Sequence, residues 1–253
     1  MKYFIRFFFS FVFICATAVS HAQTLTVSAA ASLSDAFTEI GQAFEKTHPN
    51  AKVQFNFAAA GALLQQIVQG APVDVFVSAD QEMMNRAQAQ NVIQADTRVN
   101  FIANTLVLIT PKDSTLSLHK LEDLTAPDVK LVVLGNPSVT PIGRYVRDEL
   151  QEKNLWTAIE SKLVLAETVR QSLNYVSRAE VDAGFVFATD ARIEQSKVKI
   201  AFSVSPGQDA NPFVYPIAVT VQSKNPLAAE FIAFVLSAEG QAILDKYGFV
   251  SIH

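Results

Sequence analysis

One pattern recurs along this chain and constrains its fold: a short apolar strand, a turn of small residues, and the start of an amphipathic helix. In the first copy, residues 25–28 alternate as a strand does, three alanines follow, and apolar residues then recur at helical spacing from Leu33 to Phe44. Further copies begin near residues 53, 73, 131 and 163. Because strands that alternate with helices pair in parallel, the pattern predicts an α/β fold whose mainly parallel sheets are flanked by helices.

The copies form two sets, which predicts two lobes with a ligand cleft between them. Ligands of open α/β sheets bind at the carboxyl ends of strands, where turns of this form converge. Strands that cross between the lobes near residues 104–105 and 214–215 would act as hinges. A single doubly wound domain is the alternative, since periodicity does not fix how many sheets the strands share. The expected organisation is a signal peptide at 1–22, lobe 1 at 23–104 plus 215–253, and lobe 2 at 105–214.

The first residues have the composition of a secretory signal peptide. Lys2 and Arg6 supply positive charge, residues 7–19 form an apolar core, and residues 20–22 offer a cleavage site with the small residues Ser20 and Ala22 on either side of His21. Cleavage after residue 22 would remove Cys15, the only cysteine, and leave no thiol for a disulfide, a nucleophile or a metal site. The sequence therefore predicts a soluble protein that is exported to the periplasm.

The charge balance excludes one class of partner. Without Lys2 and Arg6 the chain has 18 basic and 24 acidic residues, which is a net charge of −6 at pH 7. A nucleic-acid-binding protein usually carries a basic surface instead, so we expect no nucleic-acid partner. An anionic ligand would have to be held by local N–H and O–H dipoles, against the field of the whole protein.

Ser32 stands where the first helix is expected to begin. The N–H groups in the first turn of a helix have no partner within the helix, and the positive end of the helix dipole lies there. Because the small residues Ala29, Ala30 and Ala31 precede it, a ligand can approach the backbone closely, and the turn can hold an oxyanion. The alternative is that Ser32 only caps the helix, with Asp35 completing a capping box.

Five motifs together resemble one family. They are AAASL at 29–33, GAPVDVFVSAD at 70–80, GNPSVTPIG at 135–143, GFVFATD at 184–190 and KYGF at 246–249. With these motifs, essentially the whole mature chain is similar to the periplasmic molybdate-binding proteins of ABC importers, whose fold has two lobes around a ligand cleft. The resemblance implies a monomeric binding protein, not an enzyme, that needs no cofactor. It would capture molybdate or tungstate and deliver the oxyanion to the membrane permease of an ABC importer.

The resemblance also implies which residues surround the tetrahedral dianion: Ser32, Ala60, Ile142, Val169 and Phe187. Ser32 would donate its hydroxyl and its backbone N–H, while Ile142 and Val169 would donate backbone N–H groups from the second lobe. No direct bond between protein and metal is implied, because the metal is bound as its oxyanion.

Two of these positions depart from the family pattern. Ala60 stands where the family usually has a serine, and Phe187 stands where it usually has a tyrosine. A hydrogen bond to a charged group contributes about 1.5–3 kcal/mol, so two missing hydroxyls would weaken binding by roughly two to four decades. Thr168, beside Val169, or a bound water are the replacements that the sequence suggests.

Other functions stay open at this point. The same fold with a different small anion, such as chromate, sulfate or an organic anion, is the main alternative. An enzyme is disfavoured because the mature chain lacks cysteine and shows no Ser-His-Asp motif. A regulatory ligand-sensing domain would need a DNA-binding segment, and the N-terminus has an export signal instead.

The remaining charged and aromatic residues receive structural interpretations. Asp74, Asp80 and Asp190 are expected to cap turns and helix starts rather than to bind a metal ion. Arg144 and Arg170 each follow a predicted N–H donor, and we expect them to point outward and pair with acidic neighbours. The tyrosines are dispersed along the chain, so the sequence assigns them no role at the ligand.

Overall fold

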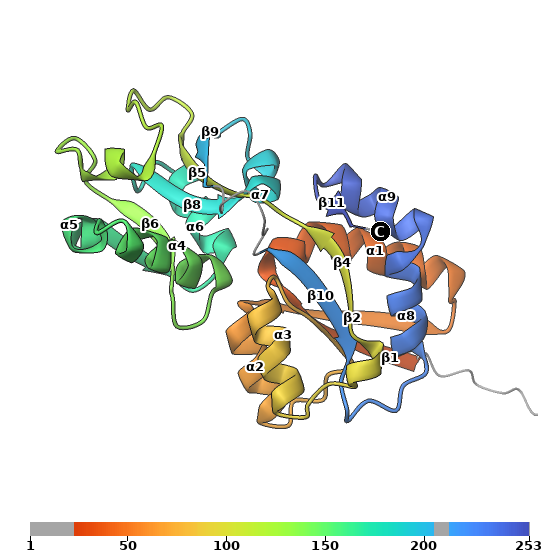
Figure 1. The fold of residues 1–253 in the computed structure, drawn as a ribbon. Helices are drawn as coiled ribbons and strands as arrows, with labels where there is room; N and C mark the ends of the chain where they lie inside the picture. The colour runs from red at the N-terminus through yellow and green to blue at the C-terminus, as the bar shows by residue number, and fades with distance from the viewer. Residues whose placement is uncertain (1–22, 205–212, 253) are drawn as a thin grey trace, which may run out of the picture.

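The computed structural model describes residues 23–204 and 213–252, and these form two lobes, each built on one sheet (Figure 1). The first sheet takes its strands from residues 23–103 and 214–251, and the second takes its strands from residues 106–203. The signal peptide expected at 1–22 lies outside the described residues. The predicted α/β fold with a sheet in each lobe is confirmed.

The sheet of the first lobe has the strand order β11-β4-β10-β3-β1-β2. β1 pairs in parallel with β2 and β3, as the alternating pattern predicts. β10 pairs antiparallel with β3 and β4, because it enters this sheet from the other lobe rather than through a helical crossover. The bounds are β1 Gln23–Ala30, β2 Ala51–Ala58, β3 Val75–Val77, β4 Val99–Ala103, β10 Val214–Val219 and β11 Val250–Ser251.

The sheet of the second lobe has the strand order β7-β6-β8-β5-β9. β6 pairs in parallel with β7 and β8, whereas β5, which arrives from the first lobe, pairs antiparallel with β8 and β9. Each sheet therefore adds antiparallel pairs to its parallel core where the chain crosses between lobes. The bounds are β5 Leu106–Pro111, β6 Val132–Gly135, β7 Leu163–Ala166, β8 Ala183–Phe187 and β9 Val198–Ser203.

Helices pack on both faces of the sheets, since alternate strand residues point to opposite sides. On β5, Leu106 and Leu108 join the cluster that contains α4, while Val107 and Ile109 join the cluster that contains α6.

Within the described ranges no single helix is long and apolar enough to cross a membrane, although α8 and α9 would pass that test as a pair bent by 63°. The bounds are α1 Ser34–Thr47, α2 Ala60–Val68, α3 Gln81–Ala89, α4 Pro141–Glu152, α5 Trp156–Ile159, α6 Val169–Ser177, α7 Ala188–Ile193, α8 Leu227–Leu236 and α9 Ala238–Lys246, with short 3₁₀ turns at η1 Ala31–Leu33, η2 Ala95–Thr97, η3 Leu121–Thr125 and η4 Glu160–Lys162.

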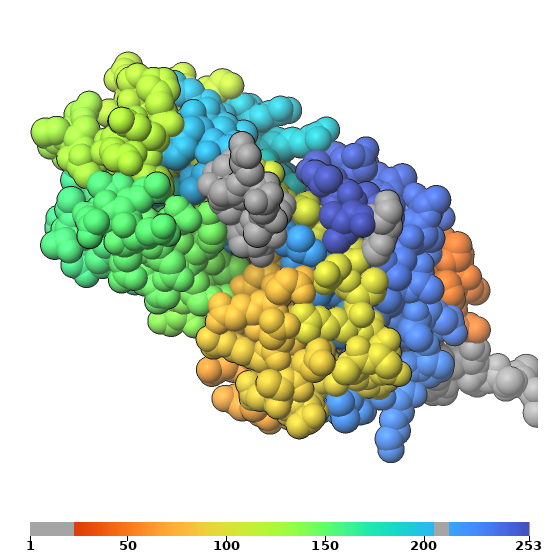
Figure 2. Space-filling model, in the orientation of Figure 1, coloured from red at the N-terminus to blue at the C-terminus, as the bar shows by residue number. Residues whose placement is uncertain are grey.

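The two lobes touch each other at the start of α4 and between α6 and η1. Figures 1 and 2 show α4 of the second lobe beside α2 and α3 of the first. A backbone hydrogen bond crosses the junction, from the N–H of Gly61 in α2 to the carbonyl oxygen of Val139 before α4, at 3.2 Å. The structure therefore has its lobes closed on each other.

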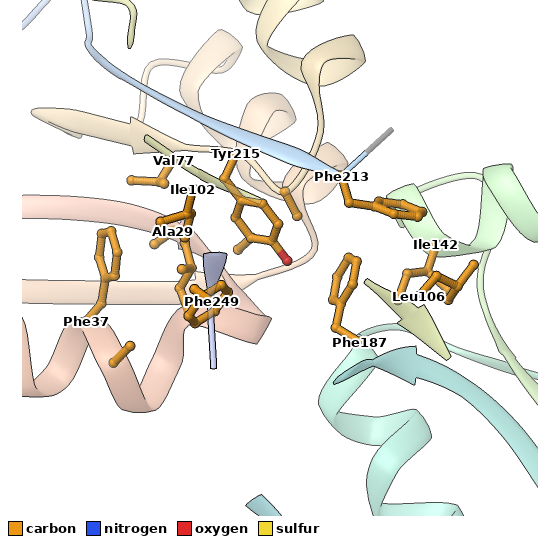
Figure 3. Packing of buried hydrophobic residues seen from close by; sticks show 14 of the residues in the cluster. Ala29, Phe37, Val77, Ile102, Leu106, Ile142, Phe187, Phe213, Tyr215 and Phe249 are labelled. Carbon is orange, nitrogen blue, oxygen red and sulfur yellow. The ribbon is translucent and has the colours of Figure 1, made fainter. Parts of the chain in front are cut away.

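Aromatic rings fill the region where the chain crosses between lobes. Phe187, at the end of β8, contacts Phe213 and Tyr215 on the returning segment, with ring centroids 5.1 and 5.8 Å apart (Figure 3). Tyr215 in turn contacts Phe249, at 5.7 Å. This row of rings packs the second lobe against the first next to the predicted hinge.

The first helix begins differently from the prediction. Ser32 lies in the 3₁₀ turn η1, α1 begins at Ser34, and no side chain caps either element. The hydroxyl of Ser32 lies 2.9 Å from the hydroxyl of Tyr215 instead. The capping interpretation of Ser32 is therefore wrong, because a residue 183 positions away holds its hydroxyl.

Candidate functional site

All five residues predicted to surround the ligand line one cavity between the lobes. Ser32 and Ala60 come from the first lobe, and Ile142, Val169 and Phe187 come from the second. The cavity leaves about 20 Å³ for the centre of a water-sized sphere, which is room for one compact guest but not for an extended molecule. The rest of its wall is formed by Ala30, Ala31, Ala58, Ala59, Ala79, Gly135, Thr140, Pro141, Ser172 and Phe185.

Three helices begin at this cavity. Ala60 is the first residue of α2, Val169 is the first residue of α6, and Ile142 is the second residue of α4. Backbone N–H groups at these positions have no carbonyl partner within their own helix, and the positive ends of the helix dipoles lie beside them. The geometry therefore offers N–H donors from both lobes to one anion.

The threonines before α4 and α6 cap a later N–H group of each helix. Thr140 Oγ1 accepts a hydrogen bond from the N–H of Gly143 at 3.0 Å, and Thr168 Oγ1 accepts one from the N–H of Gln171 at 3.1 Å. Each cap satisfies the third N–H of its helix and leaves the earlier ones unused. Thr168 does not line the cavity, so the prediction that it replaces a missing hydroxyl is wrong.

Ser32 is held by a short chain of buried polar groups from the crossing strands. Asn104 Nδ2 donates to the hydroxyl of Tyr215 at 3.3 Å, and that hydroxyl lies 2.9 Å from Ser32 Oγ. Burial raises the pKa of Tyr215 well above its usual value, so the phenol stays protonated, and either hydroxyl of this pair can be the donor. When Tyr215 donates, the hydroxyl hydrogen of Ser32 is available to a ligand.

Sequence reasoning missed Tyr215, although it placed a hinge at this residue. The periodicity of a helix or strand indicates only which face of the element a side chain occupies. The hydroxyl of Tyr215 instead contacts Ser32, which lies far away in the sequence. The position of a lone tyrosine in a crossing strand, beside the cleft, was the one available signal.

We expect Tyr215→Phe to weaken ligand binding roughly two- to tenfold, because it removes one neutral hydrogen bond that orients Ser32. Isothermal titration calorimetry on the two proteins measures this difference. Tyr247→Phe is the matched control, since its hydroxyl donates to Glu39 Oε2 at 2.8 Å on the outer side of α1. Equal loss of affinity in both variants would contradict a specific role for Tyr215.

Arg144 connects the lobes beside the cavity. From α4 it pairs with Asp80, which caps α3, and its Nε lies 2.9 Å from Glu82 Oε2. The side chains of Arg144 and Asp80 are only 12% and 10% exposed. Burial raises the pKa of Asp80, and the charge of Arg144 opposes that rise. The expected pairing with acidic residues is confirmed, but the outward direction is wrong, because the partners belong to the opposite lobe.

Arg170 makes a second connection between the lobes. From α6 its Nη2 lies 2.7 Å from Asp35 Oδ2 in α1 and 3.4 Å from the carbonyl oxygen of Ser32. Its Nε lies 2.8 Å from Asp190 Oδ1 within its own lobe. Asp190 is fully buried, and burial raises its pKa to about 6 although Arg170 opposes the rise. Asp190 also accepts the N–H of Phe187 at 3.3 Å, which agrees with its predicted place at a helix start.

No lysine, arginine, aspartate or glutamate lines the cavity, as far as the described residues go. Arg144 and Arg170 form ion pairs with carboxylates outside the cavity wall. The same described part of the chain has no group of three His, Cys, Asp or Glu side chains able to hold a metal ion. An anion in this cavity would be bound by neutral N–H and O–H donors.

Comparison with known proteins agrees with this geometry. Residues 25–250 match the family model described as bacterial extracellular solute-binding protein. The molybdate-binding protein ModA of Mycobacterium bovis is 36% identical over 90% of this chain and 85% of its own length. ModA of Haemophilus influenzae is 32% identical over 89% of each chain.

A solved structure shows the same fold. The periplasmic molybdate-binding protein of Azotobacter vinelandii superposes with a TM-score of 0.77, at 23% identity, and the match covers 89% of this chain and 98% of that one. The family and both sequence relatives are binding proteins, which confirms the prediction that the chain is not an enzyme. The family match, the two relatives and the closed two-lobed cavity show that this chain belongs to the bacterial extracellular solute-binding proteins.

Proposed function

We propose that this protein captures a tetrahedral oxyanion, molybdate or tungstate, and delivers it to the membrane permease of an ABC importer. The observation that carries the proposal is the convergence of three helix starts and the Ser32 residue, from both lobes, on one compact cavity whose described lining has no charged side chain. The similarity to two ModA proteins over about nine-tenths of the chain favours molybdate over other anions of that shape.

Ligand binding and lobe closure are coupled in this proposal. An anion bridged by Ser32 in one lobe and by Ile142 and Val169 in the other gains all its donors only when the lobes are closed. The ligand therefore shifts the population toward the closed state that a permease would recognise. We place the hinge at residues 104–105 and 214–215, between lobe 1 (23–104 plus 215–253) and lobe 2 (105–214).

Charge and size would both select the ligand. A protonated oxyanion such as hydrogen phosphate needs a hydrogen-bond acceptor for its own proton, and no carboxylate among the described residues lines the cavity. Sulfate has the same charge as molybdate, so discrimination against it must come from the dimensions of the cavity. Ala60 and Phe187 lack the usual hydroxyls, which keeps chromate, sulfate or an organic anion as the second candidate.

Calorimetry with a panel of anions tests this function. The protein without residues 1–22 is titrated with molybdate, tungstate, chromate, sulfate and phosphate at neutral pH. We expect the tightest binding with molybdate or tungstate, weaker binding with sulfate and none with phosphate. No heat with molybdate or tungstate at millimolar concentration would overturn the proposal, and tight binding of sulfate or chromate alone would establish the second candidate.

Adding the missing hydroxyls back is expected to strengthen binding. Ala60→Ser and Phe187→Tyr each place a hydroxyl at the cavity wall, and one hydrogen bond to an anion strengthens affinity by roughly ten- to 150-fold. Titration of both single variants and the double variant measures the gain. Ala62→Ser, on α2 but outside the cavity wall, is the control and should bind as the wild type does. Unchanged affinity in both restored variants would show that the ligand does not contact these two residues.

Export and oligomeric state belong to the same proposal. A periplasmic binding protein would lose residues 1–22 and act as a monomer. The match to the bacterial extracellular solute-binding proteins supports an exported location. Mass spectrometry of the protein purified from the periplasm should give an N-terminus at Gln23. Light scattering should give the mass of one chain, with and without molybdate.

A further inference from the structure

Ser172 is a residue of the cavity wall whose buried hydroxyl makes no hydrogen bond to a described residue. It lies in α6 and lines the cavity together with Val169. The residue is 0% exposed, and its Oγ has no hydrogen-bond partner among the described residues. Most buried polar groups in proteins have a partner, so a buried hydroxyl at a binding cavity without one calls for a ligand atom.

Helix geometry puts this hydroxyl next to a predicted donor. Residues three apart on a helix lie on the same face, so Ser172 lies one turn beyond Val169 on the side that meets the cavity. A serine within a helix can instead donate to the carbonyl oxygen four residues earlier. In α6 that carbonyl, of Thr168, accepts the N–H of Ser172 at 3.1 Å, and Ser172 Oγ makes no hydrogen bond to it.

The other hydroxyls in the wall already have partners. Thr140 Oγ1 donates to the carbonyl oxygen of Asn136 at 2.9 Å and accepts from Gly143 at 3.0 Å. Ser32 Oγ lies 2.9 Å from the hydroxyl of Tyr215, on the side of the first lobe. Ser172 is the hydroxyl of the described cavity wall with both its donor and its acceptor functions unused.

We propose that Ser172 donates its hydroxyl hydrogen to the bound oxyanion and supplies, from α6, the side-chain donor that Phe187 lacks on the second lobe. This inference rests on the proposed function and deepens it. The oxyanion then has one serine hydroxyl from each lobe, Ser32 from the first and Ser172 from the second, in addition to the N–H groups of the helix starts. Both hydroxyls are neutral, which suits a fully deprotonated dianion in an acidic protein.

Ser172→Ala tests the assignment, with molybdate and tungstate as the ligands in calorimetry. We expect affinity to fall by roughly ten- to 150-fold, the value of one hydrogen bond to a charged group. The Tm of the ligand-free protein should stay the same or rise, because the substitution removes a buried hydroxyl without a partner and introduces the residue that most favours helix. Ser177→Ala is the matched control on the same helix, since its hydroxyl donates to the carbonyl oxygen of Asn174 near the surface.

The outcomes separate this inference from the function on which it rests. If the wild type binds molybdate or tungstate and Ser172→Ala binds equally tightly, Ser172 is not a ligand contact and the inference is overturned while the function stands. If Ser172→Ala lowers the Tm of the ligand-free protein and reduces affinity no more than Ser177→Ala does, the hydroxyl has a structural role and the inference is also overturned. If the wild type binds no oxyanion in the panel, both proposals are overturned.

Discussion

Gly61→Ala is expected to weaken ligand binding by roughly ten- to a hundredfold while it leaves the free energy of unfolding close to that of the wild type. A Cβ atom on Gly61 would lie 2.9 Å from the carbonyl oxygen of Val139 and 3.2 Å from its Cα. Val139 belongs to the opposite lobe, so the clash exists only when the lobes are closed. In the open state the added methyl group meets no such obstacle, and alanine favours the helix more than glycine does.

Titration calorimetry measures the change in affinity. Chemical denaturation of the ligand-free protein measures the free energy of unfolding. Gly184→Ala is the contrasting control, because its Cβ would meet Val133 and would lie 2.7 Å from Val176 Cγ2 within one lobe. That variant should lose folding stability instead. A Gly61→Ala protein that binds as tightly as the wild type would show that the liganded lobes do not approach as closely as they do here.

Arg144→Gln is the second substitution with a large expected effect, a loss of about ten- to a hundredfold in affinity. It removes the cation that faces Asp80 across the lobe junction, where both side chains are nearly buried. Loss of one partner costs about 3–5 kcal/mol in a fully buried pair, and we expect about 1.4–2.8 kcal/mol here because both side chains keep about a tenth of their surface exposed. Asp80 regains water when the lobes open, so the cost falls mainly on closure and appears as weaker binding.

A double-mutant cycle with Asp80→Asn isolates the contribution of the pair. Asparagine keeps the Oδ1 acceptor that caps α3 through the N–H of Met83, so the helix start survives. We expect the double variant to bind more tightly than Arg144→Gln alone, because no unpaired carboxylate remains. Lys52→Gln is the control: it breaks an ion pair with Glu45 that is 61% and 26% exposed within the first lobe, and such pairs contribute at most about 1 kcal/mol. Additive effects of the two substitutions would contradict a direct coupling across the cleft.

Backbone N–H donors could be predicted from the sequence around each turn alone. Ile142 and Val169 were predicted as N–H donors because each stands at the start of a helix, and helix starts are marked locally by Pro141 and by the threonines before them. The same reasoning failed for Ser32 as a cap, since its side chain is bound by the distant Tyr215. The residues next to a helix start determine where N–H groups without a helical partner occur. The partner of a side-chain hydroxyl depends instead on which groups the tertiary structure places beside it.

The charged residues illustrate the same limit. The sequence paired Arg144 with acidic neighbours, but its partner Asp80 lies 64 residues away in the other lobe. Surface exposure was the expectation because arginine is seldom buried without a partner. Closure of the lobes supplies that partner and buries both groups, which no property of the residues around Arg144 could indicate.

Ser172 had a signal in the sequence that periodicity alone did not use. Its spacing of three from Val169 places both residues on one helical face, and the helix start at Val169 was predicted. The missing information was which face of α6 meets the cleft, and this depends on how the second sheet packs against the first lobe.

By itself the sequence determined the alternation of strands and helices, the small-residue turns, and therefore the donors that could meet an anion. These features depend on contacts within a few residues, and the turn and helix-start chemistry that produces them is local. Only the tertiary structure decided that the predicted donors share one cavity, that Tyr215 contacts Ser32, that Arg144 and Arg170 span the lobes, and that Ser172 Oγ has no hydrogen-bond partner among the described residues. Those facts depend on the distance between groups far apart in the chain, which is set when the two lobes close on each other.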